Sequence, residues 1–175
     1  MANVPLTSIG LYVGYVALTT ATTNTIEDVT ASTPFTALPG LYSTPDFNIA
    51  PSTADATSYD ETVYTAKVTL LREMPDNISF GARYGKEIIT AWDTAVATYN
   101  NSTTKAMWFV IAVKDPSSTT PTFDNALFFR GRPLERGLPS TEANSGIDFD
   151  LYVAPESEPT AGKLDMGSTK RRITD

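Results

Sequence analysis

The stretch SGIDFDLYVAPES, residues 145–157, alternates between apolar and polar side chains over its central part. Its apolar members are Ile147, Phe149, Leu151 and Val153, and its polar members are Asp148, Asp150 and Tyr152. Successive side chains of a β-strand point to opposite faces of the sheet, so a period of two predicts a strand. One face of this strand is expected to be buried, and the other presents two carboxylates to water.

Other apolar stretches predict four more strands and one helix. The strands are expected at residues 10–18, 61–71, 105–115 and 126–137, the last with a bulge or bend at Gly131. Residues 10–18 and 107–113 are apolar on both faces, which is typical of a strand covered on two sides or lying at a subunit contact. The helix is expected at Gly85–Asn100, where one apolar stripe recurs at helical spacing: Ile88, Trp92, Ala95, Val96 and Tyr99.

Short strands at hairpin spacing with a single helix predict a mainly β fold. We expect an antiparallel β-sandwich or small barrel with one flanking α-helix. The chain of 175 residues is expected to be a single domain. It would comprise a β core at about residues 10–157, a long loop or arm at 31–60, and an extended C-terminal tail at 158–175. The tail is mostly polar and is expected to be ordered only where a partner holds it.

Residues 34–60 are unusual because they combine frequent proline with large apolar side chains. The prolines argue against a helix or a central strand, and the apolar side chains argue against a disordered linker. Those side chains are Phe35, Leu38, Leu41, Tyr42, Phe47 and Ile49. Two interpretations remain open: a loop folded back over its own core, or an inter-subunit arm laid on a neighbouring copy.

The composition excludes several classes of function. The chain contains no Cys and no His, which removes disulfides, thiolate nucleophiles, the commonest general base and the commonest metal ligand. We therefore expect no enzyme activity, no cofactor and no metal. No stretch is long and apolar enough to predict a membrane span, and the N-terminus does not resemble a secretory signal. The net charge of −7 argues against binding to nucleic acid.

Asp148 and Asp150 are the residues whose arrangement most suggests a catalytic or metal-binding role. Two residues apart on one strand, their Cα atoms lie roughly 6.5–7 Å apart, a spacing at which paired carboxylates can serve a glycosidase. Such a pair usually comes from different elements in a cleft, and a calcium loop would need a turn glycine and a terminal Glu that are missing here. An acidic, solvated face is the simplest interpretation.

The order and character of the elements resemble the major tail protein, or tail tube protein, of long-tailed bacteriophages. The resemblance covers roughly residues 60–157. It rests on the helix GKEIITAWDTAVATYN, the Trp-bearing strand KAMWFVIAVKD, the glycine-containing strand ALFFRGRPLERGLP and the closing strand GIDFDLYVAPES. It depends on the sequence of elements and on no short diagnostic motif.

The resemblance implies a β-sandwich with a flanking helix that assembles into hexameric rings. The rings would stack into a virion tail tube, assembled in the host cytoplasm with other phage tail proteins, through which DNA passes without specific binding. Long loops and termini would bridge neighbouring subunits and rings. For such a tube we predict that Asp148 and Asp150, on the wet face of the closing strand, face the lumen. The alternative is a receptor- or carbohydrate-binding β-sandwich module on a virion or cell surface, which would carry an aromatic-lined pocket.

Overall fold

The computed structural model describes residues 11–19, 25–30, 33–45, 53–55, 67–69, 76–113, 122–139, 147–165 and 170–173. The strands are β1 (Leu11–Leu18), β2 (Pro34–Ala37), β3 (Leu41–Ser43), β4 (Thr53–Asp55), β5 (Lys67–Thr69), β6 (Ile78–Arg83), β7 (Ala106–Val113), β8 (Thr122–Pro133), β9 (Asp148–Pro155), β10 (Thr160–Asp165) and β11 (Lys170–Ile173). The helices are the short 3₁₀ helix η1 (Ile26–Asp28) and α2 (Lys86–Asn101). The fold is mainly β with one α-helix in the described part of the chain, which confirms the expected fold class.

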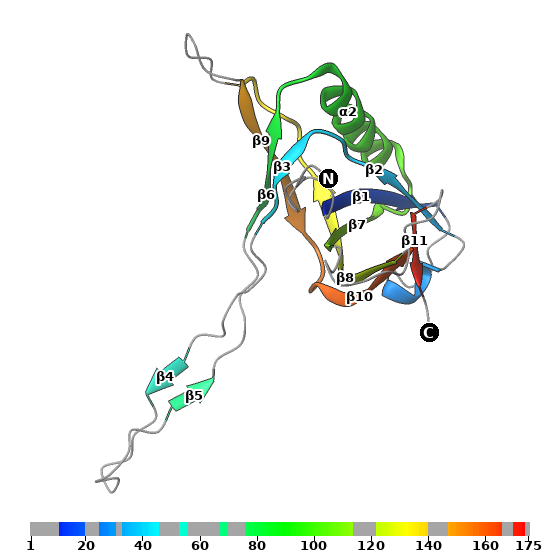
Figure 1. Cartoon of the computed structure of the whole chain (residues 1–175). Coiled ribbons are helices and arrows are strands. Elements are labelled where there is room, and N and C mark those ends of the chain that lie inside the picture. Colours follow the sequence, from blue (N-terminus) through cyan, green and yellow to red (C-terminus); the bar gives the residue numbers. More distant parts are fainter. Residues whose placement is uncertain are drawn as a thin grey trace, which may run out of the picture. The chain divides into compact units, whose positions relative to one another are not determined.

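Six strands close into a small barrel. Their order is β10–β11–β2–β1–β7–β8, and pairing of β10 with β8 completes the circle. Each of these pairings is antiparallel. Closure matters because an open sheet edge presents unpaired backbone groups. Figure 1 shows these strands curling around one another, with α2 outside them.

The barrel interior is filled by every second side chain of its strands. The core cluster comprises Val29, which follows η1, and nine strand residues: Leu18, Phe35, Ala106, Trp108, Val110, Ala112, Ala126, Phe128 and Leu164. The rings of Phe35 and Phe128 lie 5.8 Å apart between centroids. Tyr12 packs against this cluster and donates a hydrogen bond of 3.3 Å to the carbonyl of Phe35. Burial raises the pKa of Tyr12, so its hydroxyl stays neutral inside the fold.

The outward side chains of β7 are buried as well. Met107 and Phe109 point away from the barrel interior, and the ring of Phe109 stacks on Phe129 of β8 at 5.6 Å. Helix α2 lies against β8 and β1 on the outside of the barrel and buries four residues of the predicted stripe, Ile88, Trp92, Ala95 and Tyr99, whereas the fifth, Val96, is half-buried. The continuous apolar run of β7 is therefore explained by the first of the two alternatives predicted from the sequence, because both faces of the strand are covered.

The last part of β8 belongs to a second arrangement of strands. Residues Gly131–Pro133 pair with β9, β9 pairs with β6, and β6 pairs with β3, all antiparallel. These four strands form a sheet that continues from the barrel through β8 (Figure 1). Gly131 lies at the transition, and a Cβ there would come within 2.4 Å of Val153 Cγ1. Glycine therefore permits the close approach of β8 and β9.

Asp46–Pro75 forms a separate compact unit between β3 and β6. Its described part is an antiparallel pair, β4 with β5, in which Ala54 lies opposite Val68. In the sequence, the unit lies between β3 and β6, which are paired neighbours in the sheet. The expected strand at 61–71 is described only at β5, and its other residues lie outside the described ranges.

The prediction that residues 158–175 form an extended tail is wrong. Residues 160–165 and 170–173 are β10 and β11, and they close the barrel between β8 and β2. The polar sequence concealed this because backbone pairing needs few apolar side chains, and Leu164 alone of β10 is buried in the core cluster. Arg172 adds a polar anchor: its guanidinium donates to the carbonyls of Ile26 (2.9 Å) and Val29 (3.3 Å).

The predicted loop at 34–60 also contains regular secondary structure in its first part. Residues 34–37 form β2 inside the barrel, and 41–43 form β3. Pro34 is tolerated because it is the first residue of its strand. The segment is therefore neither one long loop nor one arm, since its first part belongs to the core of its own chain.

Removing the anchor of the last strand should loosen the barrel. Arg172→Ala loses two hydrogen bonds from a charged donor and the contact of the guanidinium with the Phe128 ring, 6.0 Å from its centroid. We expect the free energy of unfolding to fall by about 1.5–3 kcal/mol in urea denaturation. Lys163→Ala, at an exposed position of β10, is the matched control and should stay within about 0.5 kcal/mol of the wild type. Equal stability of the two variants would contradict this role.

Candidate functional site

The sheet formed by β8, β9, β6 and β3 has one dry and one wet face. On β9 the side chains of Leu151 and Val153 are buried, whereas Asp148, Asp150 and Tyr152 are exposed. The register places Arg83, Gly81 and Ser79 of β6 opposite those three exposed residues. We call this surface the polar face; its members are Ser79, Arg83, Arg132, Asp148, Asp150 and Tyr152. The alternation predicted from the sequence is confirmed.

Both carboxylates of the polar face have neighbours, and neither is tightly held. Asp148 Oδ1 lies 3.7 Å from Arg83 Nε, with 45% and 75% of the two side chains exposed. Asp150 Oδ2 accepts a long hydrogen bond of 3.4 Å from the hydroxyl of Tyr152. An exposed ion pair at this distance contributes little to stability. The carboxylates are therefore surface groups, free to meet whatever the polar face contacts.

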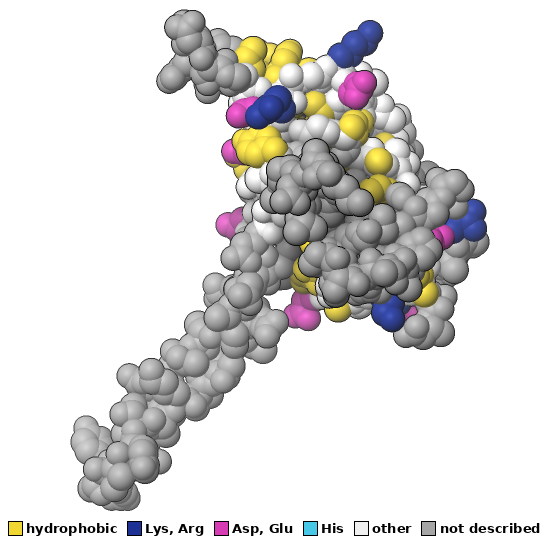
Figure 2. Space-filling model, in the orientation of Figure 1, with side chains coloured by type: hydrophobic (Ala, Val, Ile, Leu, Met, Phe, Trp, Pro, Cys, Tyr) yellow, Lys and Arg dark blue, Asp and Glu magenta, His cyan; other side chains and the backbone are white. Residues whose placement is uncertain are grey.

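The charge of the polar face differs from the acidic face expected from the sequence. Arg83 lies opposite Asp148, and Arg132 lies opposite Ala154, whose side chain shares the face of Asp150 and Tyr152. Two arginines thus accompany the two aspartates, and the formal charge of the face is balanced. The coloured part of the surface in Figure 2 likewise mixes cationic and anionic side chains without a broad field of one sign.

Edge strand β3 extends the polar face through a contact with Gly81. A Cβ at Gly81 would meet Ser43 Oγ at 2.6 Å and Tyr42 Cζ at 2.9 Å. The backbone N–H of Gly81 also donates to Ser43 Oγ at 3.3 Å. Glycine therefore lets two side chains of β3 lie across β6. The ring of Tyr42 remains 54% exposed at the edge of the sheet.

A hollow of about 360 Å³ lies beside the first half of β9. We call it the loop-end hollow; it is lined by Gly137, Leu138, Pro139, Asp148, Phe149, Asp150 and Tyr152. Leu138 is 90% exposed, the highest value among the exposed large apolar residues of the described chain. Its segment is nevertheless held to α2, because Arg136 forms a two-pronged pair with Asp93 at 2.8 and 3.0 Å. Sequence periodicity gave no signal for this feature, since it depends on a loop.

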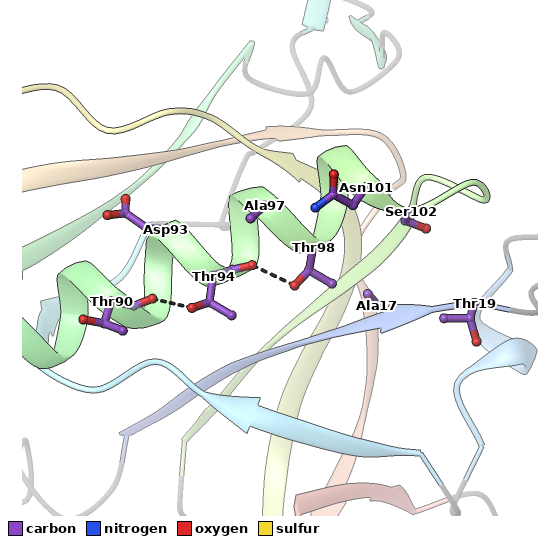
Figure 3. A pocket seen from close by; sticks show the side chains of 9 residues that line it. All are labelled: Ala17, Thr19, Thr90, Asp93, Thr94, Ala97, Thr98, Asn101 and Ser102. Atoms are coloured by element: carbon purple, nitrogen blue, oxygen red, sulfur yellow. Dashed lines mark hydrogen bonds between the residues drawn. The ribbon is translucent and has the colours of Figure 1, made fainter.

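A larger hollow of about 720 Å³ lies beside α2 (Figure 3). Its lining is Ala17, Thr19, Thr90, Asp93, Thr94, Ala97, Thr98, Asn101 and Ser102. The hydroxyls of Thr94 and Thr98 donate to the helix carbonyls four residues before them, at 2.6 and 2.7 Å. Those hydroxyls are therefore occupied, and the lining has no aromatic side chain for a sugar to stack on. The hollow does not have the character of a carbohydrate site.

The residues of the expected inter-subunit arm do not form one segment with a common role. Phe35 and Leu38 are buried in the core of their own chain and cannot serve a neighbour without unfolding it. Leu41 is half-buried and Tyr42 is exposed, both on edge strand β3. Phe47 and Ile49 lie outside the described residues. An arm that begins after β3 stays a prediction.

Nothing in the described ranges assembles a metal site: no three His, Cys, Asp or Glu side chains come together there. Across the same ranges, no helix has the length and apolar character needed to cross a membrane. The described residues with raised tyrosine pKa values do not form a catalytic pair. Burial raises the pKa of Tyr15, and burial together with the Glu156 carboxylate raises that of Tyr99. The absence of enzyme activity stays a prediction.

Comparison with known proteins gives a likeness in fold without a likeness in sequence. No protein-family model and no curated protein sequence matches the chain. A chain in the six-fold symmetrised cryo-EM structure of the anti-feeding prophage baseplate superposes with a TM-score of 0.50 at 10% identity. The match covers 90% of this chain and 94% of that one. At this identity the likeness concerns the fold alone, and it spans nearly the whole length of both chains.

Neutralising the two carboxylates should leave the fold intact. In Asp148→Asn with Asp150→Asn, the lost contacts are one exposed ion pair and one long hydrogen bond. We expect the free energy of unfolding, measured in urea, to change by less than about 1 kcal/mol. A loss of several kcal/mol would mean that the carboxylates serve the fold and would remove the reason to assign them a surface role.

Proposed function

We propose that this protein is a structural component of a phage-like tail, whose copies assemble into rings that stack into a tube. The tube would conduct DNA out of the virion without binding it specifically. The protein would act in the virion tail after assembly in the host cytoplasm, beside other tail proteins, without catalytic activity or a cofactor.

The observation that carries the proposal is the four-stranded sheet with one polar face and one packed face. Leu151 and Val153 are buried on its dry face, so the surfaces of the described sheet that partners can reach are the polar face, the edge at β3, and the edge of Gly131–Pro133 that β7 does not pair with. A tube wall needs such a sheet: wet toward the bore, dry toward the rest of the subunit, and open at its side. The superposition on a baseplate chain supports the proposal, since that structure comes from a six-fold assembly.

Ring geometry supports a bore of the right size. Six copies of four strands at ~4.8 Å spacing give an untilted circumference of roughly 115 Å. The backbone diameter is then about 37 Å, and a strand tilt of ~40° enlarges it to about 48 Å. After inward side chains are placed, the opening remains wide enough for a DNA duplex. Because the edge strands of a four-stranded antiparallel sheet run in opposite directions, neighbouring copies can continue the antiparallel alternation.

The polar face gives the bore a lining of balanced charge. We infer that Asp148 and Asp150 face this lumen, together with Arg83 and Arg132. A wall of cations would hold phosphates through many ion pairs. Interleaved carboxylates prevent that, and at physiological salt each charge is felt only within about 8 Å. DNA would thus meet a wall that neither holds nor strongly repels it.

The unit at Asp46–Pro75 is the natural candidate for contact between copies. Its residues lie between two neighbouring strands of the sheet in the sequence, and they form a compact unit of their own. Its sequence carries the large apolar residues Phe47 and Ile49. The inter-subunit arm would therefore comprise this unit together with the exposed edge at Leu41 and Tyr42.

The second candidate function is a receptor- or carbohydrate-binding module. The loop-end hollow favours it, because Tyr152 and Phe149 accompany two carboxylates that can accept hydrogen bonds from sugar hydroxyls. That function requires no ring. The two candidates are therefore separated by the state of assembly and not by the presence of the hollow.

The wild-type protein should form rings and tubes of uniform bore. Sedimentation velocity and negative-stain imaging over a range of concentrations would detect them, alone and together with the assembly partners of the tail. A protein that stays monomeric or trimeric under all these conditions, and binds glycans, would contradict the proposal and favour the second candidate.

Reversing the charge of the two aspartates should make the bore bind DNA. Asp148→Lys with Asp150→Lys replaces two negative charges by two positive ones, which shifts the formal charge of the polar face of each copy by +4 and leaves its arginines in place. We expect tubes of this variant to retain short duplex DNA in a co-sedimentation assay, with retention falling steeply as salt rises. The Asp148→Asn, Asp150→Asn variant is the control and should retain far less. Tubes that bind DNA equally in both variants would contradict the lumen assignment.

A further inference from the structure

Leu138 is an apolar side chain that its own chain leaves in water, although the segment around it is held in place. The side chain is 90% exposed. Two contacts fix the segment: Arg136 pairs with Asp93, and the carbonyl of Leu134 accepts a hydrogen bond of 2.9 Å from Trp92 Nε1. A segment that is already anchored loses little conformational freedom when a partner covers it. Leu138 is therefore well suited to contact a partner.

A separate hollow of about 380 Å³ lies on the outer face of the barrel, at the end of β7. We call it the barrel-end hollow. Its apolar lining includes Ile111, Val113, Leu127 and Ala161, and Lys163 is the charged residue among the described residues that line it. Ile111 is buried and lies opposite Leu127, whereas Val113 is 49% exposed. The barrel-end hollow is thus an apolar depression into which a projecting aliphatic side chain can pack.

The projecting leucine and the barrel-end hollow lie toward opposite ends of β8. Near the start of β8, Asn125 lies opposite Val113 and lines the barrel-end hollow. At its end, Pro133 pairs with β9, and the chain continues from there to Leu138, which lies beside Asp148 at the start of β9. The eight residues of strand from Asn125 to Pro133 span up to about 26 Å. The two patches of one copy therefore cannot contact each other, but they can contact the patches of other copies.

We propose that Leu138 of one copy inserts into the barrel-end hollow of a second copy. The inference rests on the proposed function and adds to it a contact between rings. Because the two patches differ and lie toward opposite ends of one strand, the contact is head-to-tail, and every stack keeps one unused patch at each end. In the proposed tube, strand edges meet neighbours in the same ring, whereas strand ends meet the next ring. The contact therefore lengthens the tube.

Charge favours a second copy as the occupant of the barrel-end hollow. Asp148 and Asp150 line the surface beside Leu138. The ion pair of Asp148 with Arg83 is exposed and 3.7 Å long, so it offsets only part of this negative charge. The receiving hollow carries the exposed Lys163. Attraction between opposite charges, felt within about 8 Å at physiological salt, orients the two copies as they meet. This attraction requires no direct ion pair, so the carboxylates can still face the bore.

A carboxylate on either side of the contact should stop assembly at single rings. Leu138→Asp and Val113→Asp each place a charge that the contact would bury against apolar side chains, whereas in the single copy both positions are open to water. Each variant should melt within a few degrees of the wild type, and negative stain should show rings instead of tubes. Ala97→Asp places the same charge in the hollow beside α2 and is the control, which should leave tube length unchanged.

A cross-linking experiment tests the two residues as a pair, because the chain contains no cysteine of its own. Leu138→Cys combined with Val113→Cys gives every copy one thiol at each patch. In assembled tubes, a short thiol-to-thiol cross-linker should join these copies into chains longer than one ring, seen on a denaturing gel. Tubes of either single-cysteine variant should give monomers. Tubes assembled from equal amounts of the two single variants should give dimers and no longer chains.

The outcomes separate this inference from the proposed function. Tubes of wild-type length from Leu138→Asp, or tubes whose double-cysteine copies stay monomeric after cross-linking, would overturn the contact while the tube survives. Cross-linked chains that stop at the size of one ring would place the contact within rings and overturn the stacking role. If Leu138→Asp does not fold, the cross-linking result decides alone. If the wild type forms neither rings nor tubes, the proposed function fails, and this inference fails with it.

Discussion

One strand, β8, belongs to two structures at once, and the rest of the molecule depends on this sharing. Its first part pairs with β7 and β10 in the barrel, and its last three residues pair with β9 in the polar-faced sheet. At the transition, Arg130 Nε lies 3.3 Å from Glu156 Oε2, and the hydroxyl of Tyr99 on α2 donates to Glu156 Oε1 at 2.9 Å. One carboxylate thus connects helix, barrel and sheet where β8 changes partners.

This sharing separates the sources of stability from the surface that meets partners. The barrel interior is filled by an apolar cluster that includes Trp108 and Phe128, and α2 covers the outer face, where Trp92, Phe109 and Phe129 are buried in a second apolar layer. The sheet is held at one side by β8 and beneath by its dry face, and we expect its polar face to be dispensable for folding. Side chains there are free to be selected for charge and shape. Such a division suits a protein whose copies form a wall around something that must pass.

Much of the fold could be predicted from local pattern, and the failures have physical causes. Period-two alternation located β9 and its two exposed carboxylates, and helical spacing located α2 with its buried stripe. The prediction of an extended tail at residues 158–175 failed because a closing strand is stabilised mainly by backbone pairing. In this polar sequence only Leu164 and Arg172 act as side-chain anchors among the described residues. The charge balance of the polar face escaped prediction because Arg83 and Arg132 come from other strands, and only the register places them beside the aspartates. The loop-end hollow depends on tertiary contacts of a loop, for which periodicity has no signature.

The central claim is that the polar face of the shared-strand sheet lines a continuous bore. A cryo-EM reconstruction of the assembled protein tests it most directly, because it places every copy of β9 relative to the tube axis. The account predicts that Asp148, Asp150 and Arg132 point into the lumen in each copy, with the barrel and α2 outside. A reconstruction in which the polar face lies on the exterior, or at the contact between rings, would contradict it.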